Sequence, residues 1–221
     1  MRARLLCLAM LLTSCGLDLR GGGGGGAETQ FSGQAVKLIA NPGALRNANG
    51  VLQGTGTSIF RQPLLGVNSA ASYEVEFTLQ NNGELILISH GDENLNGAFQ
   101  IRFLRRGAGR NSLNVTLQAG GATRGSINDQ GVDLFSNVDA SLPLRFQVDV
   151  HNDEGAASHV LIWDITRTRD VFNPFTALLN TRDPRKSNYG SPGRGAGDRW
   201  GMQLQNATVA RGLLSTPKFL D

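Results

Sequence analysis

One stretch of the chain decides its fold: residues 73–88 read YEVEFTLQNNGELILI. Apolar and polar residues alternate through its first half, which is the period of a half-buried β-strand. The Asn and Gly residues at positions 81–83 tolerate the positive φ that tight hairpin turns require. The stretch therefore predicts two antiparallel strands joined by a turn at residues 81–83.

The same alternation recurs along most of the chain, in short runs separated by Gly, Asn and Asp. It predicts further strands at residues 99–103, 113–117, 144–150, 158–166, 200–205 and 209–214. Residues 174–180 allow one short helical turn, and no longer stretch combines a helical period with capping residues. About eleven strands without crossover helices predict an all-β fold of two antiparallel sheets packed face to face, as a jelly-roll sandwich.

The order of these segments resembles the concanavalin A-like lectin and glucanase superfamily, and within it the laminin G-like domains. The segments that carry the resemblance are residues 54–60, 73–77, 97–103, 113–118, 143–150 and 201–209. The resemblance implies a jelly-roll sandwich over about residues 31–219, with glycan recognition on one concave sheet face. The chain departs from many such domains because it lacks a Trp-His pair at residues 144–146.

The N-terminal segment predicts where the protein is located. Arg2 and Arg4 precede the apolar run at residues 5–12, which is too short to span a bilayer. The sequence LTSC at residues 12–15 resembles the lipobox of bacterial lipoproteins. We expect a signal peptide at residues 1–14 and lipidation of Cys15. An ordinary secretory signal that happens to contain a cysteine is the alternative.

A glycine tract at residues 21–26 follows the predicted lipid anchor. Such a tract has maximal backbone freedom, so residues 15–29 are predicted to be a tether and residues 30–221 a single β-sandwich domain. The chain is thus expected to be anchored to a membrane through Cys15 and not to span it. Resemblance to known lipoproteins implies the outer membrane, because Gly16 and not Asp follows the cysteine.

Cysteine usage and charge exclude several functions. The two cysteines, Cys7 and Cys15, both lie in the N-terminal segment, so the predicted domain has neither a disulfide nor a thiol nucleophile. The sequence has 21 Lys and Arg and 18 Asp and Glu residues, and removal of Arg2 and Arg4 leaves nineteen basic residues. A nearly neutral domain gives no electrostatic reason to expect nucleic acid as a partner.

Polar side chains at alternate positions of several strands form the candidate binding site. Paired donors and acceptors on neighbouring strands suit sugar hydroxyl groups. The candidate ligand-binding residues are Gln100, Arg102, Asn114, Arg145, Gln147 and Asp149, with Tyr189 in a long loop as the candidate for stacking on a sugar ring. A plain solvent-facing surface is the alternative, since every alternating strand has one.

A second candidate site is a calcium loop at Asp92, Asn94 and Asn96. The pattern Asp-x-Asn-x-Asn-Gly places oxygen ligands at alternate positions before a glycine turn. The EF-hand pattern then fails, because Phe103 occupies the position of its bidentate glutamate. Calcium would need carboxylates from another loop, such as Asp129, Asp133 or Asp153, and a plain polar turn is the alternative.

Catalysis is not predicted. The carboxylate triplet Glu-x-Asp-x-x-Glu of related glucanases is absent, although Glu74 and Glu76 share a strand face. The sequence also lacks a Gly-x-Ser-x-Gly elbow, and its histidines are scattered. We therefore expect a lipid-anchored, non-catalytic carbohydrate-binding or adhesion module that binds a polysaccharide. The alternatives are a protein-interaction or structural component of the outer membrane, which binds an envelope or host protein, and a glycan-degrading enzyme.

Overall fold

The structure is a computed structural model that describes residues 28–31, 34–40, 46–48, 51–60, 70–119, 122–126, 135, 137–152, 158–166, 174–182 and 194–215. Every regular element in these residues is a β-strand. The strands are β1 (Glu28–Phe31), β2 (Gln34–Ala40), β3 (Arg46–Ala48), β4 (Val51–Phe60), β5 (Ala70–Gly91), β6 (Phe99–Arg105), β7 (Leu113–Ala119), β8 (Ala122–Ser126), β9 (Leu144–His151), β10 (His159–Asp164), β11 (Leu179–Asn180) and β12 (Arg199–Ser215). The predicted all-β class is confirmed. The described part of the chain contains no apolar helix of membrane-spanning length.

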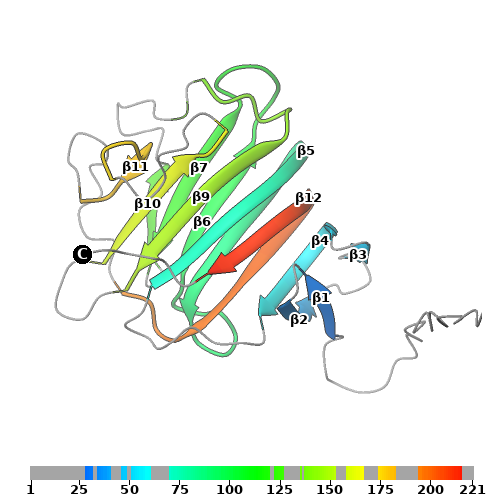
Figure 1. Ribbon diagram of the computed structural model, residues 1–221, viewed down its shortest axis with the longest axis vertical. Coiled ribbons are helices and arrows are strands. Elements are labelled where there is room, and N and C mark those ends of the chain that lie inside the picture. Colours follow the sequence, from blue (N-terminus) through cyan, green and yellow to red (C-terminus); the bar gives the residue numbers. More distant parts are fainter. Residues whose placement is uncertain are drawn as a thin grey trace, which may run out of the picture.

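The twelve strands of the described residues form one hydrogen-bonded sheet (Figure 1). Its main path runs β1-β2-β4-β12-β5-β6-β7-β8, and a branch from β5 continues through β9 and β10 to β11. Each of these pairings is antiparallel, as predicted. Strand β5 therefore pairs with three other strands, β12, β6 and β9.

The predicted hairpin at residues 81–83 is wrong. Strand β5 continues through these residues, and β12 pairs with it on both sides of them. Gln205 pairs with Glu84 and Ala207 with Leu79, so residues 80–83 lie opposite a single residue, Asn206. Asn82 has φ 56°. The Asn-Asn-Gly signal was correct about backbone conformation, but a strand irregularity needs positive φ as much as a hairpin turn does.

This irregularity divides β5 between two neighbours. Residues 70–77 pair with β9, whereas residues 84–89 pair with β6. Strand β6 then lies against β9, because the rings of Phe103 and Phe146 stack with their centroids 5.2 Å apart. The ring centroids of Phe77 and Phe103 lie 5.3 Å apart. Figure 1 shows β6 and β7 crossing behind β9 and β10.

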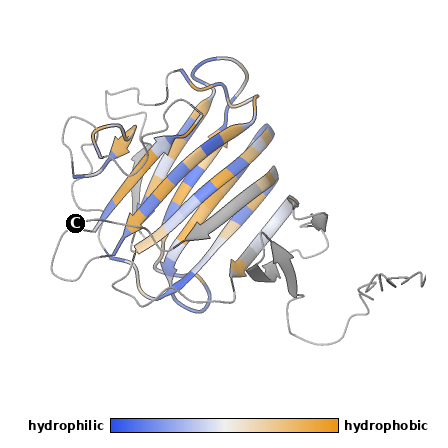
Figure 2. Ribbon diagram, viewed as in Figure 1, coloured by the Kyte–Doolittle hydropathy of each residue, from blue (hydrophilic) through white to orange (hydrophobic). Residues whose placement is uncertain are grey.

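The main core lies between these two groups of strands. Tyr73, Val75, Phe77 and Leu79 are fully buried in it, as the alternation predicts. Figure 2 shows the same alternation as orange and blue bands along the strands. Burial of one face of each strand against the other group supplies the hydrophobic stabilisation of the fold.

Two smaller apolar clusters lie outside the main core. Ile86 and Ile88 project from the other face of β5 and pack with Ile59, Leu95 and Ala98. This explains why residues 85–88 are continuously apolar: both faces of β5 are covered there. A third cluster joins Leu161 and Trp163 of β10 to Ala177, with Ile165 packed against it.

Candidate functional site

The candidate ligand-binding residues lie on two opposite faces and not together on one. Phe103 on β6 and Phe146 on β9 meet across the core, and side chains one position away along each strand point outward, in opposite directions. One face, here called the β6 face, carries Glu84, Gln100, Arg102, Asn114, Thr116, Gln118, Gln203 and Gln205. The opposite β9 face carries Ser72, Glu74, Arg145, Gln147, Asp149 and His151. Strand alternation predicts which residues point outward, but not which strands share a layer.

The β6 face arranges its side chains as a grid across four neighbouring strands. Ile86 on β5 lies between Gln203 on β12 and Arg102 on β6, and Arg102 pairs with Thr116 on β7. Adjacent strands are about 4.8 Å apart, so these groups are close neighbours. Gln203 and Gln205 are exposed and Gln100 is half-buried, whereas Asn114 is buried. The three glutamines and Arg102 are therefore accessible to a ligand, whereas Ile86 between them is covered by the second apolar cluster.

Glu84 fixes the orientation of Arg102. The Arg102 Nε–H donates to Glu84 Oε2 at 2.7 Å, and Nη2 donates to the same oxygen. Glu84 is 6% exposed, while the Arg102 side chain is 45% exposed. The ion pair thus presents an oriented guanidinium to solvent. Sequence reasoning missed Glu84, because its partner is set by the register between β5 and β6.

The β9 face holds a buried polar cluster built on Asp149. Asp149 Oδ1 accepts hydrogen bonds from the Ser72 hydroxyl at 2.5 Å and from Gln147 Nε2 at 2.8 Å. Gln147 Nε2 also donates to the Ser72 hydroxyl. Burial raises the pKa of Asp149, and these hydrogen bonds offset part of that rise. Sequence reasoning assigned Gln147 and Asp149 to an exposed row, but both are buried.

Charged and aromatic groups surround this cluster. Arg145 Nη2 donates to Glu74 Oε1, and the two side chains are 39% and 27% exposed. The rings of His151 and His159 stack on neighbouring strands with their centroids 4.1 Å apart. Asp149 Oδ2 and Arg145 Nε are buried and have no hydrogen-bond partner in the described structure. Glu74 therefore belongs to an ion pair, and a further carboxyl group, that of Asp149, lies on the adjacent strand.

The predicted calcium residues come together in one loop. Asp92 Oδ1 accepts the backbone N–H groups of Asn94 and Asn96, each at 2.8 Å, and Oδ2 accepts from Asn96 Nδ2 at 3.2 Å. These bonds, first those from the Asn96 and Asn94 backbones, lower the pKa of Asp92. In the described part of the chain, no three His, Cys, Asp or Glu residues are grouped to hold a metal. Asp129, Asp133 and Asp153 lie outside that part, so calcium binding stays a prediction.

A second loop is attached beside the Asp92 loop. The Gly195 N–H donates to Asn152 Oδ1 at 2.9 Å, and Asn152 Nδ2 donates to Gly195 O at 3.3 Å. The Gly197 N–H donates to His90 O at 3.0 Å. A Cβ atom on Gly195 would lie 2.4 Å from that of His90, so only glycine fits this close approach.

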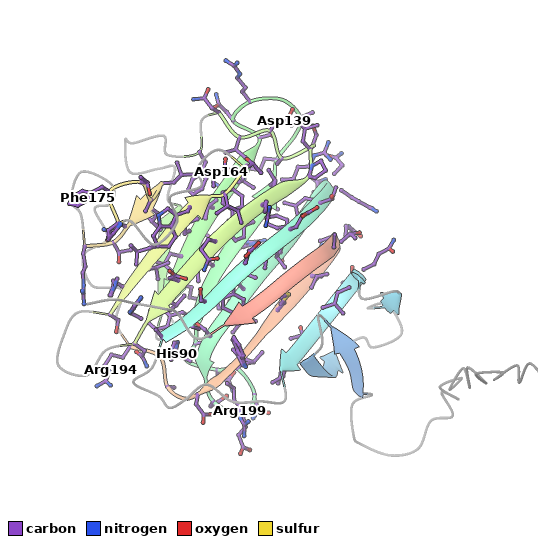
Figure 3. The ribbon with its side chains drawn as sticks, viewed as in Figure 1. His90, Asp139, Asp164, Phe175, Arg194 and Arg199 are labelled. Atoms are coloured by element: carbon purple, nitrogen blue, oxygen red, sulfur yellow. The ribbon has the colours of Figure 1, made fainter. Side chains whose placement is uncertain are left out.

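The loops divide between two ends of the sheet. Figure 3 shows His90, Arg194 and Arg199 at one end, and Asp139 and Asp164 at the other. Tyr189, the candidate stacking residue, lies in a segment outside the described residues. Cys15, the candidate lipidation site, also lies outside them. The roles of both residues stay predictions.

No protein-family model matches the chain, and no curated protein matches it. Among solved structures, the chain is similar to the carbohydrate-binding module CBM66 from Bacillus subtilis, with 9% identity, a TM-score of 0.48 and coverage of 81% of this chain and 94% of that one. A mutant of the GH43 protein BlXynB from Bacillus licheniformis gives 10% identity and a TM-score of 0.48, with 82% of this chain and 37% of that one covered. The alginate lyase Aly36B gives 10% sequence identity and a TM-score of 0.37, with 78% of this chain and 86% of that one covered. These similarities are distant, and no function follows from them.

Proposed function

We propose that this chain is a lipid-anchored, non-catalytic carbohydrate-binding module that binds a polysaccharide through the β6 face. The observation that supports this most is the oriented, half-exposed guanidinium of Arg102 within a grid of accessible amide groups. Sugar hydroxyls donate and accept hydrogen bonds, and Gln side chains offer both functions. Arginine adds donors in a fixed geometry. A polysaccharide lying across the strands would meet Gln203, Arg102 and Thr116 in one row, with Gln100 two positions along β6 from Arg102.

The fold that accompanies this proposal is a two-sheet jelly-roll sandwich of the concanavalin A-like type. Support for it comes from the bend in β5, which passes the strand from its β9 neighbour to its β6 neighbour. The stacking of Phe103 on Phe146 also supports it. In such a sandwich each layer has one solvent-facing side, and the β6 face is the more accessible of the two.

The binding proposal is tested with a triple variant, Gln100→Ala, Arg102→Ala and Gln203→Ala. We expect its affinity for a bound polysaccharide to fall by about 10-fold to 1,000-fold, because each of the three lost hydrogen bonds contributes about 0.5–1.5 kcal/mol. The control is Gln80→Ala with Arg110→Ala, which removes an exposed amide and an exposed guanidinium outside the β6 face. Equal affinity in both variants would contradict the role of this face.

Calcium binding at Asp92, Asn94 and Asn96 is tested in the same assay. Polysaccharide binding is measured with added calcium and again with a chelator. If calcium holds this loop in its binding conformation, the chelator weakens binding, and Asp92→Asn abolishes that difference. Binding that is identical in both conditions rejects calcium as a cofactor.

A protein-interaction role is the second candidate. It is favoured by Phe175, whose side chain is 80% exposed in a turn next to the buried Ala177. Single exposed apolar residues are common, so this observation has less weight than the β6 face. Crosslinking in envelope preparations tests it: a partner lost on Phe175→Ser would favour this role over glycan binding.

A further inference from the structure

The β9 face carries a second polar arrangement that binding at the β6 face does not use. Ser72, Gln147 and Asp149 form its buried floor, while Glu74 and Arg145 form a partly exposed ion pair beside it. We propose that this face is a separate binding site for a neutral, hydroxyl-rich ligand of about disaccharide length, anchored by Asp149 Oδ2 and Arg145 Nε. The inference goes beyond the proposed function, because the site lies on the opposite face and does not depend on it.

The Asp149 carboxyl group has an oxygen atom without a hydrogen-bond partner. Two donors already hold Asp149 Oδ1, so the carboxyl group is fixed and Oδ2 is left without a partner. A buried polar atom without a partner destabilises the fold, and native proteins partner nearly all such atoms with protein, water or a ligand. A ligand hydroxyl that donates to Oδ2 would recover this free energy.

Arg145, on the same face of β9, has a donor atom without a hydrogen-bond partner. Arg145 uses Nη2 to bind Glu74, whereas its Nε–H is buried without an acceptor. Positions 145 and 149 lie about 13 Å apart along an extended strand, with Gln147 between them. Ordered water could partner each group separately, whereas one ligand that extends along β9 and offers both a donor and an acceptor would partner both together, and hydroxyl groups provide both functions.

The charged groups of the β9 face favour a neutral ligand over an ion. Glu74 and Arg145 neutralise each other as an ion pair, and an anionic ligand would offer no donor to the Asp149 carboxyl group. No metal-binding group of three side chains occurs in the described residues either. The face thus offers one acceptor and one donor without partners, and no set of charges that would hold an ion.

Access to this site follows from the ion pair. The Glu74 and Arg145 side chains are 27% and 39% exposed, so they border solvent, whereas Asp149 is fully buried. A partly exposed ion pair typically contributes little to stability. We expect a ligand to approach from this side, which borders solvent.

The test is NMR titration of the purified protein with four neutral disaccharides: sucrose, maltose, cellobiose and lactose. We expect at least one to shift the Arg145 Nε–H and Gln147 side-chain amide resonances saturably. Asp149→Asn replaces the acceptor Oδ2 with a donor and should weaken that binding at least about 10-fold. Arg145→Lys keeps the positive charge opposite Glu74 but lacks the Nε–H donor, so it should also weaken disaccharide binding. This variant keeps the test valid if Asp149→Asn folds poorly.

The triple variant of the β6 face separates this inference from the proposed function. It should keep the disaccharide shifts at the β9 face unchanged. Absence of a shift with all four sugars, or equal shifts in wild type and Arg145→Lys, would mean that ordered water alone occupies the face, and would overturn the inference. The polysaccharide-binding proposal is tested separately, by the triple variant of the β6 face.

Discussion

The Tyr73 hydroxyl joins the two longest strands of the structure. It donates to Ile88 O within β5 and accepts the Gly201 N–H from β12, and its ring packs edge-on against Trp200 with centroids 5.8 Å apart. Burial raises the pKa of Tyr73 well above its ordinary value, so the hydroxyl stays protonated and can donate. This residue therefore holds β5 and β12 in register near the core.

Tyr73→Phe tests that role, since it removes only the hydroxyl. We expect the free energy of unfolding to fall by about 1–2 kcal/mol, because a buried donor and a buried acceptor lose their partner. Urea denaturation followed by fluorescence measures this change. An unchanged midpoint would show that the hydroxyl contributes nothing to the pairing of these strands.

Asp149 makes stability depend on pH in a direction that can be measured. Because burial raises its pKa, the folded protein holds this proton more tightly than the unfolded chain does. The resulting stabilisation is complete below the ordinary carboxyl pKa of about 3.9 and is lost as pH rises through the raised value. We expect the stability of wild type relative to Asp149→Asn to fall over that range in urea titrations. A difference that rises with pH would contradict the burial of this carboxyl group.

Individual residues show how far the sequence predicts the site. Alternation placed Tyr73 and Phe77 in the core correctly, because it depends only on neighbours along the chain. The hydrogen bond from Ser72 to Asp149 joins residues 77 positions apart, and local pattern contains no information about such a pair. The buried polar cluster was therefore visible only in the structure.

At the scale of the element, the irregularity of β5 at residues 80–83 separates the residues that pair with β9 from those that pair with β6. Gly83 lies at its tightest point, where a Cβ atom would be 2.4 Å from Asn206 O and 2.8 Å from backbone atoms of Gln80. These are backbone atoms, so they cannot move aside without disturbing the pairing of β5 with β12. The glycine is a steric requirement of this irregularity.

Gly83→Ala should destabilise the fold by about 1–3 kcal/mol, the usual cost of an overpacked site. Asn82→Gly is the matched variant, because residue 82 has φ 56° and glycine adopts that conformation without strain. We expect it to leave stability unchanged or to raise it. Thermal unfolding of both variants measures the contrast, and two equal melting temperatures would contradict the proposed geometry of the bend.

The sequence predicted most strands but not their partners. Alternation identified β6, β7, β9 and β10, because each has one face in the main core. It failed at β5 because an Asn-Asn-Gly tripeptide predicts a positive φ and not the direction of the following chain. That direction depends on β12, which pairs along β5 from far away in the sequence.

At the scale of the whole molecule, we propose a membrane anchor that lies outside the described residues. The lipobox-like LTSC sequence and the glycine tract at residues 21–26 support lipidation of Cys15. Cys15→Ala should release the protein from the membrane fraction, because the lipid chains supply the binding free energy. Fractionation with metabolic palmitate labelling measures this. Membrane association retained by an unlabelled variant would contradict the lipoprotein assignment.

The two polar faces also belong to this scale. The sequence could not assign the outward residues to one face or the other, because outward residues of all strands look alike in a one-dimensional pattern. The contact of Phe103 on β6 with Phe146 on β9 distinguishes an accessible face with Arg102 from a buried cluster with Asp149. Binding must therefore be measured for each face independently.

Binding of a polysaccharide by the β6 face is measured on a glycan array. The purified wild-type protein and the variant carrying Gln100→Ala, Arg102→Ala and Gln203→Ala are applied to the same array, with calcium present. The account predicts saturable binding of wild type to a defined set of glycans and loss of that signal in the variant. A blank array for wild type, or the same signal from both proteins, would contradict it.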